Sequence, residues 1–182
     1  RPDLLRLREA TVDHAMEVGD VMFLPEREMV ARAGESSPYE MRGDEAYNPL
    51  RDMLEAAELV GAADAAARQI ALLDDPRDVV RYYAAAGLYA GRHELEGHLD
   101  EVRAGLERET SPIVRIELAA AVAEASRLLE GEPDAGAIGL LADFIASDDP
   151  YLAHQAIWKV LYTPDLADRF AHAIDEARPR WQ

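Results

Sequence analysis

Apolar side chains recur every three or four residues along most of this chain, and that spacing is the period of an amphipathic helix. The clearest row is formed by Leu95, Leu99, Val102 and Leu106. Glycines and prolines divide the pattern into separate segments. Besides the repeated helices described next, the pattern predicts helices over Asp3 to about Gly19, Pro25 to Ala33, Leu50 to Val60, Ala63 to Leu73, and Asp165 to about Ala177.

One nine-residue stretch occurs three times between residues 80 and 160. It begins at Val80 as VRYYAAAGL, at Val114 as VRIELAAAV and at Leu152 as LAHQAIWKV. Each copy follows a proline that is itself preceded by a residue able to cap a helix: Asp75-Pro76, Ser111-Pro112 and Asp149-Pro150. These prolines stand 36 and 38 residues apart, and an amphipathic helix precedes each of them. A two-helix unit with such a period is typical of an α-solenoid.

Alanine-rich helices support the same architecture. Aromatic residues make up only 7% of the chain, whereas alanine is abundant. The runs Ala84 to Ala86 and Ala119 to Ala121 would let neighbouring helices approach within roughly 8–10 Å. The expected fold class is therefore all-α: an α-α superhelix, or solenoid, preceded by an N-terminal helix and an irregular arm. Arg81 and Arg115 are expected to form bonds within or between the repeat units.

The first part of the chain has a different character. Four apolar residues, Val21 to Leu24, are stopped by Pro25, and turn-forming residues are dense from Gly34 to Pro49. We expect a surface arm pinned by Met22, Phe23, Leu24 and Tyr39, with a binding loop as the alternative. The sequence thus predicts two regions, the helix and arm over residues 1–49 and the repeat domain over residues 50–182, ending in a capping helix.

Charge excludes several classes of partner. The net charge is -17, so duplex nucleic acid and an anionic membrane surface are not expected to bind. The chain contains no cysteine, which excludes disulfides and thiolate chemistry. No apolar run approaches the ~18 residues that a membrane span needs. The chain begins with Arg1 and not with methionine, from which we expect a truncated or processed product.

No catalytic, cofactor-binding or metal-binding residue is predicted. His93 and His98 are five residues apart, so on a helix they point about 140° away from each other, whereas a zincin motif needs both on one face. The pairs Asp74-Asp75 and Asp148-Asp149 precede prolines, where capping is the expected role. The other histidines stand alone on predicted helices, and no glycine-rich phosphate loop occurs.

One candidate interaction surface remains. If Val80, Ala84 and Leu88 face the core, Tyr82 and Tyr89 project from the opposite side of the same helix. The aligned residues Ile116 and His154 would extend this surface through the later copies, and Phe23 and Leu24 are a second candidate. The alternative for the tyrosines is packing against the N-terminal arm.

The repeated stretches resemble HEAT repeats of the short type, whose inner helix follows D-P-x-x-x-V-R-x-x-A-A-x-x-L. Asp75-Pro76, Val80-Arg81 and Ala84 to Leu88 match this pattern closely, and the second copy matches from Val114-Arg115. The third copy has Ala153 in place of the arginine.

Residues near the start resemble the junction at the end of a bacterial sulfatase of the alkaline-phosphatase superfamily, where HEAT-like helices follow. The matching residues are Asp20, Phe23-Leu24-Pro25-Glu26 and Ser37-Pro38-Tyr39-Glu40. Such sulfatases use a formylglycine beside a calcium ion, but the formylglycine motif is missing here. The resemblance implies a C-terminal appendage that is not itself an enzyme and holds no cofactor, with calcium expected only in the sulfatase domain.

The resemblance further implies that the partner is the sulfatase catalytic domain or another protein, with self-association through an uncovered patch as a further possibility. The parent sulfatase would be periplasmic, secreted or cytoplasmic, and the sequence does not distinguish these. The alternative function is a free-standing HEAT adaptor that binds a basic protein segment. A HEAT-fold enzyme is a third class: the negative charge argues against a DNA glycosylase, and nothing specific supports a phycobilin lyase.

Overall fold

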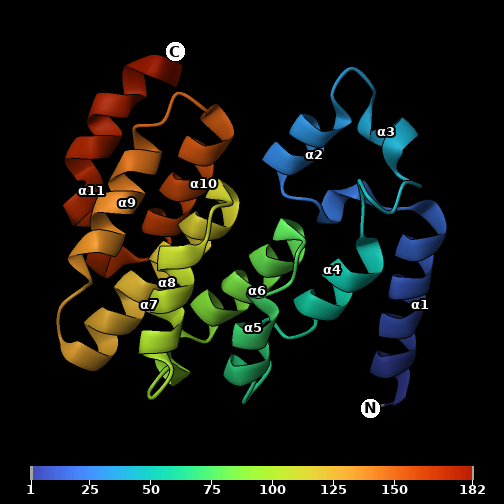
Figure 1. Ribbon diagram of the computed structural model, residues 1–182, viewed down its shortest axis with the longest axis horizontal. Coiled ribbons are helices and arrows are strands. Elements are labelled where there is room, and N and C mark those ends of the chain that lie inside the picture. The colour runs from blue at the N-terminus through green and yellow to red at the C-terminus, as the bar shows by residue number, and fades with distance from the viewer. Residues whose placement is uncertain (1, 182) are drawn as a thin grey trace. The chain divides into compact units, whose positions relative to one another are not determined.

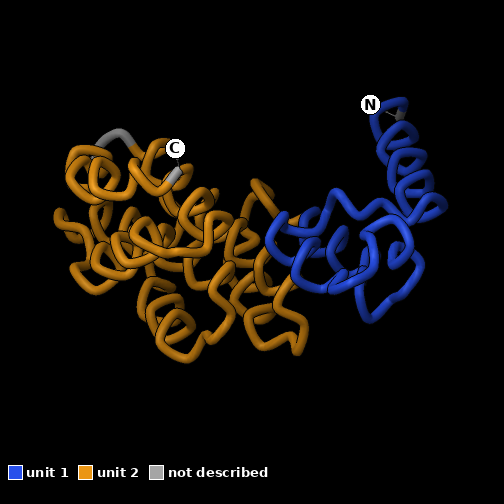
Figure 2. Tube along the Cα trace, turned by 90° about the horizontal axis from the view of Figure 1, so that it is seen from above, with its two compact units in different colours: residues 1–58 blue, residues 59–182 orange. Residues whose placement is uncertain are grey.

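The computed structural model describes residues 2–181, and all the regular secondary structure in this part of the chain is helical, which confirms the predicted all-α class (Figure 1). Because alanine and unbranched residues dominate and turn residues separate them, no strand forms among the described residues. The chain divides into two compact units, residues 1–58 and 59–182, which are coloured separately in Figure 2. The sequence-based boundary at 49/50 concerns the end of a sulfatase-like region and stays a prediction.

Unit 1 contains four α-helices and one 3-10 helix among its described residues: α1 (Pro2–Val18), η1 (Val21–Phe23), α2 (Glu26–Ala33), α3 (Pro38–Met41) and α4 (Leu50–Ala57). Helix α1 ends where Gly19 adopts a left-handed φ of 65°. A side chain at Gly19 would place its Cβ 2.9 Å from the carbonyl oxygen of Arg42, so glycine is required at this crossing.

The predicted arm is more ordered than its turn-rich sequence indicates. Ser37 and Glu40 form a capping box that starts α3 inside it. The Tyr47 hydroxyl donates to the Met29 carbonyl oxygen at 2.8 Å, and the Asn48 amide donates to the carbonyl oxygens of Gly19 and Arg42. The arm is therefore held by buried polar contacts near its end.

Two of the residues predicted to pin the arm do not do so. Met22 and Tyr39 are 76% and 69% exposed, whereas Leu24 is buried. The Tyr39 ring lies instead against the Arg42 guanidinium, whose carbon is 3.8 Å from the ring centroid. The pattern of apolar residues does not distinguish an apolar side chain that packs from one that stays in solvent.

Unit 2 holds the remaining helices, whose order along the chain can be followed by colour from green to red in Figure 1. They are α5 (Ala66–Leu72), α6 (Asp78–Ala90), η2 (Arg92–Glu94), α7 (Leu99–Arg108), α8 (Pro112–Glu130), α9 (Ala135–Ile145), α10 (Pro150–Leu161), α11 (Pro164–Ala177) and η3 (Arg178–Trp181). The three copies of the repeated stretch lie on α6, α8 and α10.

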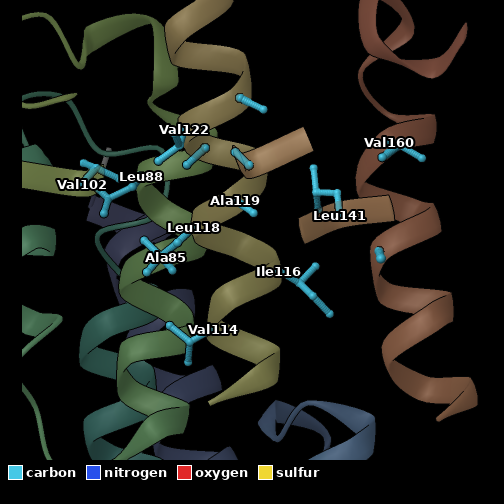
Figure 3. Packing of buried hydrophobic residues seen from close by; sticks show 14 of the residues in the cluster. Ala85, Leu88, Val102, Val114, Ile116, Leu118, Ala119, Val122, Leu141 and Val160 are labelled. Carbon is cyan, nitrogen blue, oxygen red and sulfur yellow. The ribbon is translucent and has the colours of Figure 1, made fainter. Parts of the chain in front are cut away.

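Helix α8 forms the centre of unit 2, because it packs against α6, α7, α9 and α10. Figure 3 shows Leu118 and Val122 of α8 pointing toward Ala85 and Leu88 of α6. Ile116 points to the opposite side, toward α9 and α10 (Figure 3). A helix covered on both sides needs apolar or internally paired side chains nearly all round.

Of the three residues predicted to cap a helix before a proline, only one does so. Asp149 accepts hydrogen bonds from the amides of Tyr151 and Leu152 and so caps α10, as predicted. Asp75 instead binds the side chain and amide of Arg77, and α6 begins only at Asp78. The Ser111 hydroxyl makes no capping bond to α8. Proline at the first turn is sufficient to start that helix.

Candidate functional site

The predicted interaction surface is distributed between the interior and the exterior of unit 2. Tyr82 and Tyr89 of α6 are half-buried and pack against the hydrophobic core. Ile116 has no exposed surface at all, and among these four candidates only His154, on α10, is exposed. The prediction assumed that the side of α6 opposite Ala84 is open to solvent. In the structure, α8 packs against α6 and α10 packs against α8, so these helices cover much of that side in the first two copies.

The second candidate, in unit 1, is mostly covered as well. Leu24 is 4% exposed and Phe23 is half-buried. In the folded chain, Leu24 and Ile116 therefore add no surface to which a partner has access. Whether the other candidate residues bind a partner stays a prediction.

Tyr82 and Tyr89 border a buried cluster of charged side chains that was not predicted from the sequence. Its centre is Glu117 of α8, which is completely buried. Lys159 of α10 places its Nζ 2.6 Å from Oε2 of Glu117, and the Gln155 side-chain amide donates to Oε1 at 3.1 Å. Burial raises the pKa of Glu117, and the Lys159 charge opposes that change.

The aromatic rings of α6 complete this cluster. The Nζ of Lys159 lies 4.6 Å from the ring centroid of Tyr89, and the Arg92 guanidinium lies 4.9 Å from the same ring. Burial raises the pKa of both tyrosine hydroxyls, and the nearby Glu117 charge raises that of Tyr82 further. Tyr82 and Tyr89 thus remain protonated at neutral pH and serve as packing groups.

A second buried carboxylate lies two turns further along α8. Glu124 is 3% exposed and interacts with Arg92 at 3.6 Å and with Arg127 at 3.1 Å. Glu117 and Glu124 are seven residues apart and form one polar edge on an otherwise apolar helix. Both carboxylates are neutralised by nearby cations, so this edge provides neither a free general base nor an open cation site.

Beside the cluster, α10 and the residue that caps its C-terminus present aromatic side chains at four-residue spacing: His154, Trp158 and Tyr162. Trp158 and Tyr162 are 44% and 68% exposed, and their ring planes stack at 20° with centroids 5.3 Å apart. The Trp158 indole donates to Nε2 of His154. The spacing of residues 154, 158 and 162 is visible in the sequence and was the available signal for this surface.

The histidine and aspartate motifs do not assemble into a reactive site. His93 approaches its neighbour Glu94 at 3.5 Å, and His98 approaches Glu101 at 3.8 Å. Across the part of the chain that the structure describes, no three His, Asp or Glu side chains gather in a way that could hold a metal ion. None of the helices described there is both long and apolar enough to cross a membrane.

In comparisons with known proteins, no family model, no curated protein and no solved structure matches this chain.

Proposed function

We propose that this chain is a non-catalytic helical-repeat module, a HEAT-like α-solenoid at the C-terminal end of a sulfatase-like hydrolase. Its role is to pack on the catalytic domain, to mediate assembly or to bind another protein. Any calcium would belong to that catalytic domain. The motif from Asp20 to Glu40 supports the sulfatase assignment, and the repeat supports the solenoid.

Equivalent positions of the three copies have the same environment, which supports a true structural repeat. The first, fifth and ninth positions of each copy are at most 7% exposed: Val80, Ala84 and Leu88; Val114, Leu118 and Val122; Leu152, Ala156 and Val160. Since α5 packs on α6, α7 on α8 and α9 on α10, each copy has a helical mate that precedes it in the chain. These are the contacts expected of stacked helix pairs.

The observation that carries the interaction role is the uncovered apolar face of α1. Leu4, Leu5 and Leu7 are 63%, 61% and 59% exposed, and Ala15 is the one described residue of this helix that is buried. Adjacent exposed leucines on one helix indicate a surface that another protein covers. On the proposed function, that cover is the catalytic domain.

The direct test is to determine the coding sequence upstream of Arg1. A long reading frame containing a formylglycine motif supports the proposal. A start codon immediately upstream of Arg1 would contradict the sulfatase assignment. As a second test, the purified 182-residue chain should release no product from an aryl sulfate, and turnover by this chain would refute a non-catalytic role.

A free-standing adaptor that binds a basic segment is the second candidate, and the net charge of -17 favours it. The two candidates differ in their response to salt. Binding to a basic peptide should weaken steeply as salt increases, whereas packing of the α1 leucines on a catalytic domain should not.

A further inference from the structure

The two arginines of the repeated V-R pair have different environments. In the first copy, Arg81 is fully engaged: it donates to both carboxylate oxygens of Glu109 at 2.7 and 2.9 Å and to the Asp75 carbonyl oxygen at 2.9 Å. In the second copy, the side chain of Arg115 forms no hydrogen bond or ion pair with any residue that the structure describes. Its Nε is buried and has no acceptor.

Arg115 lines a cleft of about 490 Å³ in unit 2, bounded by α7, α8 and α9. Leu106 and Leu140 contribute apolar walls, and Gly139 keeps one side open because a Cβ added there would meet no atom within 4 Å. The cleft is large enough for a small organic molecule or the end of a peptide. It therefore combines apolar surface with one unpaired guanidinium.

The other charges of the cleft define the kind of anion that fits. Arg103 is already bound to Glu130 at 3.0 Å, to Ser126 at 3.1 Å and to Asp134 at 3.4 Å. Glu107 and Asp143 are exposed on the rim and repel a multiply charged anion. A guanidinium binds both carboxylate and phosphate through two parallel hydrogen bonds. Because Glu107 and Asp143 repel a dianion more strongly than a monoanion, a monoanionic carboxylate suits this site better than phosphate or sulfate.

We propose that Arg115 binds the carboxylate of an apolar ligand, with the apolar part lying between Leu106 and Leu140. The ligand is either a free aromatic or aliphatic acid or the C-terminal residue of a partner peptide, which share this chemistry. This site lies in unit 2, and the proposal does not depend on the sulfatase assignment.

The test is a titration of the ¹⁵N-labelled chain followed by NMR at the arginine Nε–Hε resonances. The probes are phenylacetate, its uncharged analogue phenylacetamide, inorganic phosphate, and a short peptide ending in Phe with a free or an amidated carboxyl group. We expect phenylacetate or the free-acid peptide to shift the Arg115 resonance selectively. Tighter binding of the free acid identifies a small-molecule site, and tighter binding of the peptide identifies a partner's C-terminus.

Three variants control for structure. Arg115→Gln should weaken binding by at least about tenfold, since it removes the charge-assisted pair. Gly139→Leu should also weaken it by filling the cleft while leaving the arginine intact. Arg108→Gln, at an exposed arginine that pairs with Asp74, should change nothing. Each variant is first checked for native helicity by circular dichroism.

Four results would overturn the proposal, and the first three concern affinity. They are equal binding of phenylacetamide, equal binding of phosphate, and an unchanged affinity in both Arg115→Gln and Gly139→Leu. Shifts spread evenly over all exposed arginines would indicate an adventitious ion only, and would overturn it as well.

Discussion

Glu117 is a carboxylate held in the interior of unit 2, where water cannot solvate its charge. Lys159 and Gln155 of α10 replace that solvation, and they connect the second copy of the repeat to the third. A buried ion pair adds little net stability, but removing one partner leaves an uncompensated charge. The cluster therefore contributes more to fixing the position of α8 relative to α10 than to the free energy of unfolding.

Replacing Lys159 by methionine should lower the free energy of unfolding by about 3–5 kcal/mol near neutral pH. Burial already raises the pKa of Glu117, and loss of the Lys159 charge raises it further. In the window between the unfolded pKa near 4.5 and the raised folded pKa, the folded state holds the extra proton, so stability falls as pH increases. Urea unfolding should show a larger loss at about pH 8 than at about pH 5.

The double variant Glu117→Gln/Lys159→Met is the matched control for this prediction. It removes both charges, so it should recover most of the lost stability and show no difference between the two pH values. A loss in Lys159→Met that is the same at both pH values would contradict a buried, ionised Glu117.

Glu109 should give the opposite dependence on pH. Burial alone would raise the pKa of Glu109, but hydrogen bonds from Arg81 and from the Ser111 amide outweigh it and the net pKa is lowered. The stabilisation is therefore present above the unfolded pKa near 4.5 and is lost as pH falls through the folded pKa. Glu109→Gln should lower the free energy of unfolding by about 1.5–3 kcal/mol at neutral pH.

The measurement for Glu109 is urea unfolding of wild type and variant across the acidic range. The two curves should converge as pH falls below the lowered folded pKa of Glu109, because the carboxyl group is then protonated in both states. A constant difference between the two proteins throughout that range would refute the assigned pKa direction.

Glycine has two different roles within the helices of unit 2. At Gly87 of α6, an added Cβ would lie 2.7 Å from the side-chain carbon of Gln69 on α5, and Gln69 is itself fixed by a 2.7 Å hydrogen bond to the Leu59 carbonyl oxygen. At Gly139 of α9, the same Cβ meets nothing. Of these two glycines, only Gly87 is required for its helix to approach a neighbouring helix.

Alanine substitutions at these two glycines should therefore change stability in opposite directions. Gly87→Ala should cost about 1–3 kcal/mol through overpacking against Gln69. Gly139→Ala should gain about 0.5–1 kcal/mol, since alanine loses less backbone entropy in a helix interior. Thermal unfolding followed by circular dichroism distinguishes them. Stabilisation by both substitutions would show that helix propensity governs both positions, and destabilisation by both would show that Gly139 is also packed closely.

At the scale of the whole molecule, the net charge of -17 places acidic groups close together on a small surface. Screening lengths shorten from about 30 Å at 0.01 M salt to about 8 Å at 0.15 M, so mutual repulsion weakens as salt is added. The midpoint of thermal unfolding should therefore rise with sodium chloride. Replacing three exposed acids, Glu35, Glu96 and Asp168, by their amides should reduce that rise. A midpoint that falls as salt is added to the wild-type protein would contradict the repulsion between acidic groups.

The leucines of α1 should make the isolated chain self-associate, because nothing in unit 1 covers them. Sedimentation velocity at increasing protein concentration should show dimers or larger species. The double variant Leu4→Glu/Leu7→Glu should remain monomeric, whereas Leu128→Glu, at a leucine of α8 that is 45% exposed, should behave like wild type. Association that persists unchanged in the α1 variant would place the contact elsewhere.

Helix positions follow from the sequence because their determinants are local. Spacing of apolar residues, prolines at first turns and glycines at ends each act within a few residues, which is why the all-α class and the copies at Val80, Val114 and Leu152 could be predicted. The same local information indicates which residues share a helix face. It does not indicate how many faces of a helix other helices will cover. For that reason Ile116 was predicted to lie on a surface, although it is completely buried.

The roles of Arg115 and Glu117 were decided only by the tertiary structure. They are two residues apart on α8, and both are charged. Glu117 is neutralised because α10 brings Lys159 and Gln155 beside it, while no acceptor reaches the Nε of Arg115. Spacing along the chain cannot supply this difference, since the partners are about forty residues away and meet α8 only when the helices pack. The sequence by itself determined the helices and their repeat, and tertiary packing determined that Glu117 is paired while Arg115 has no partner among the described residues.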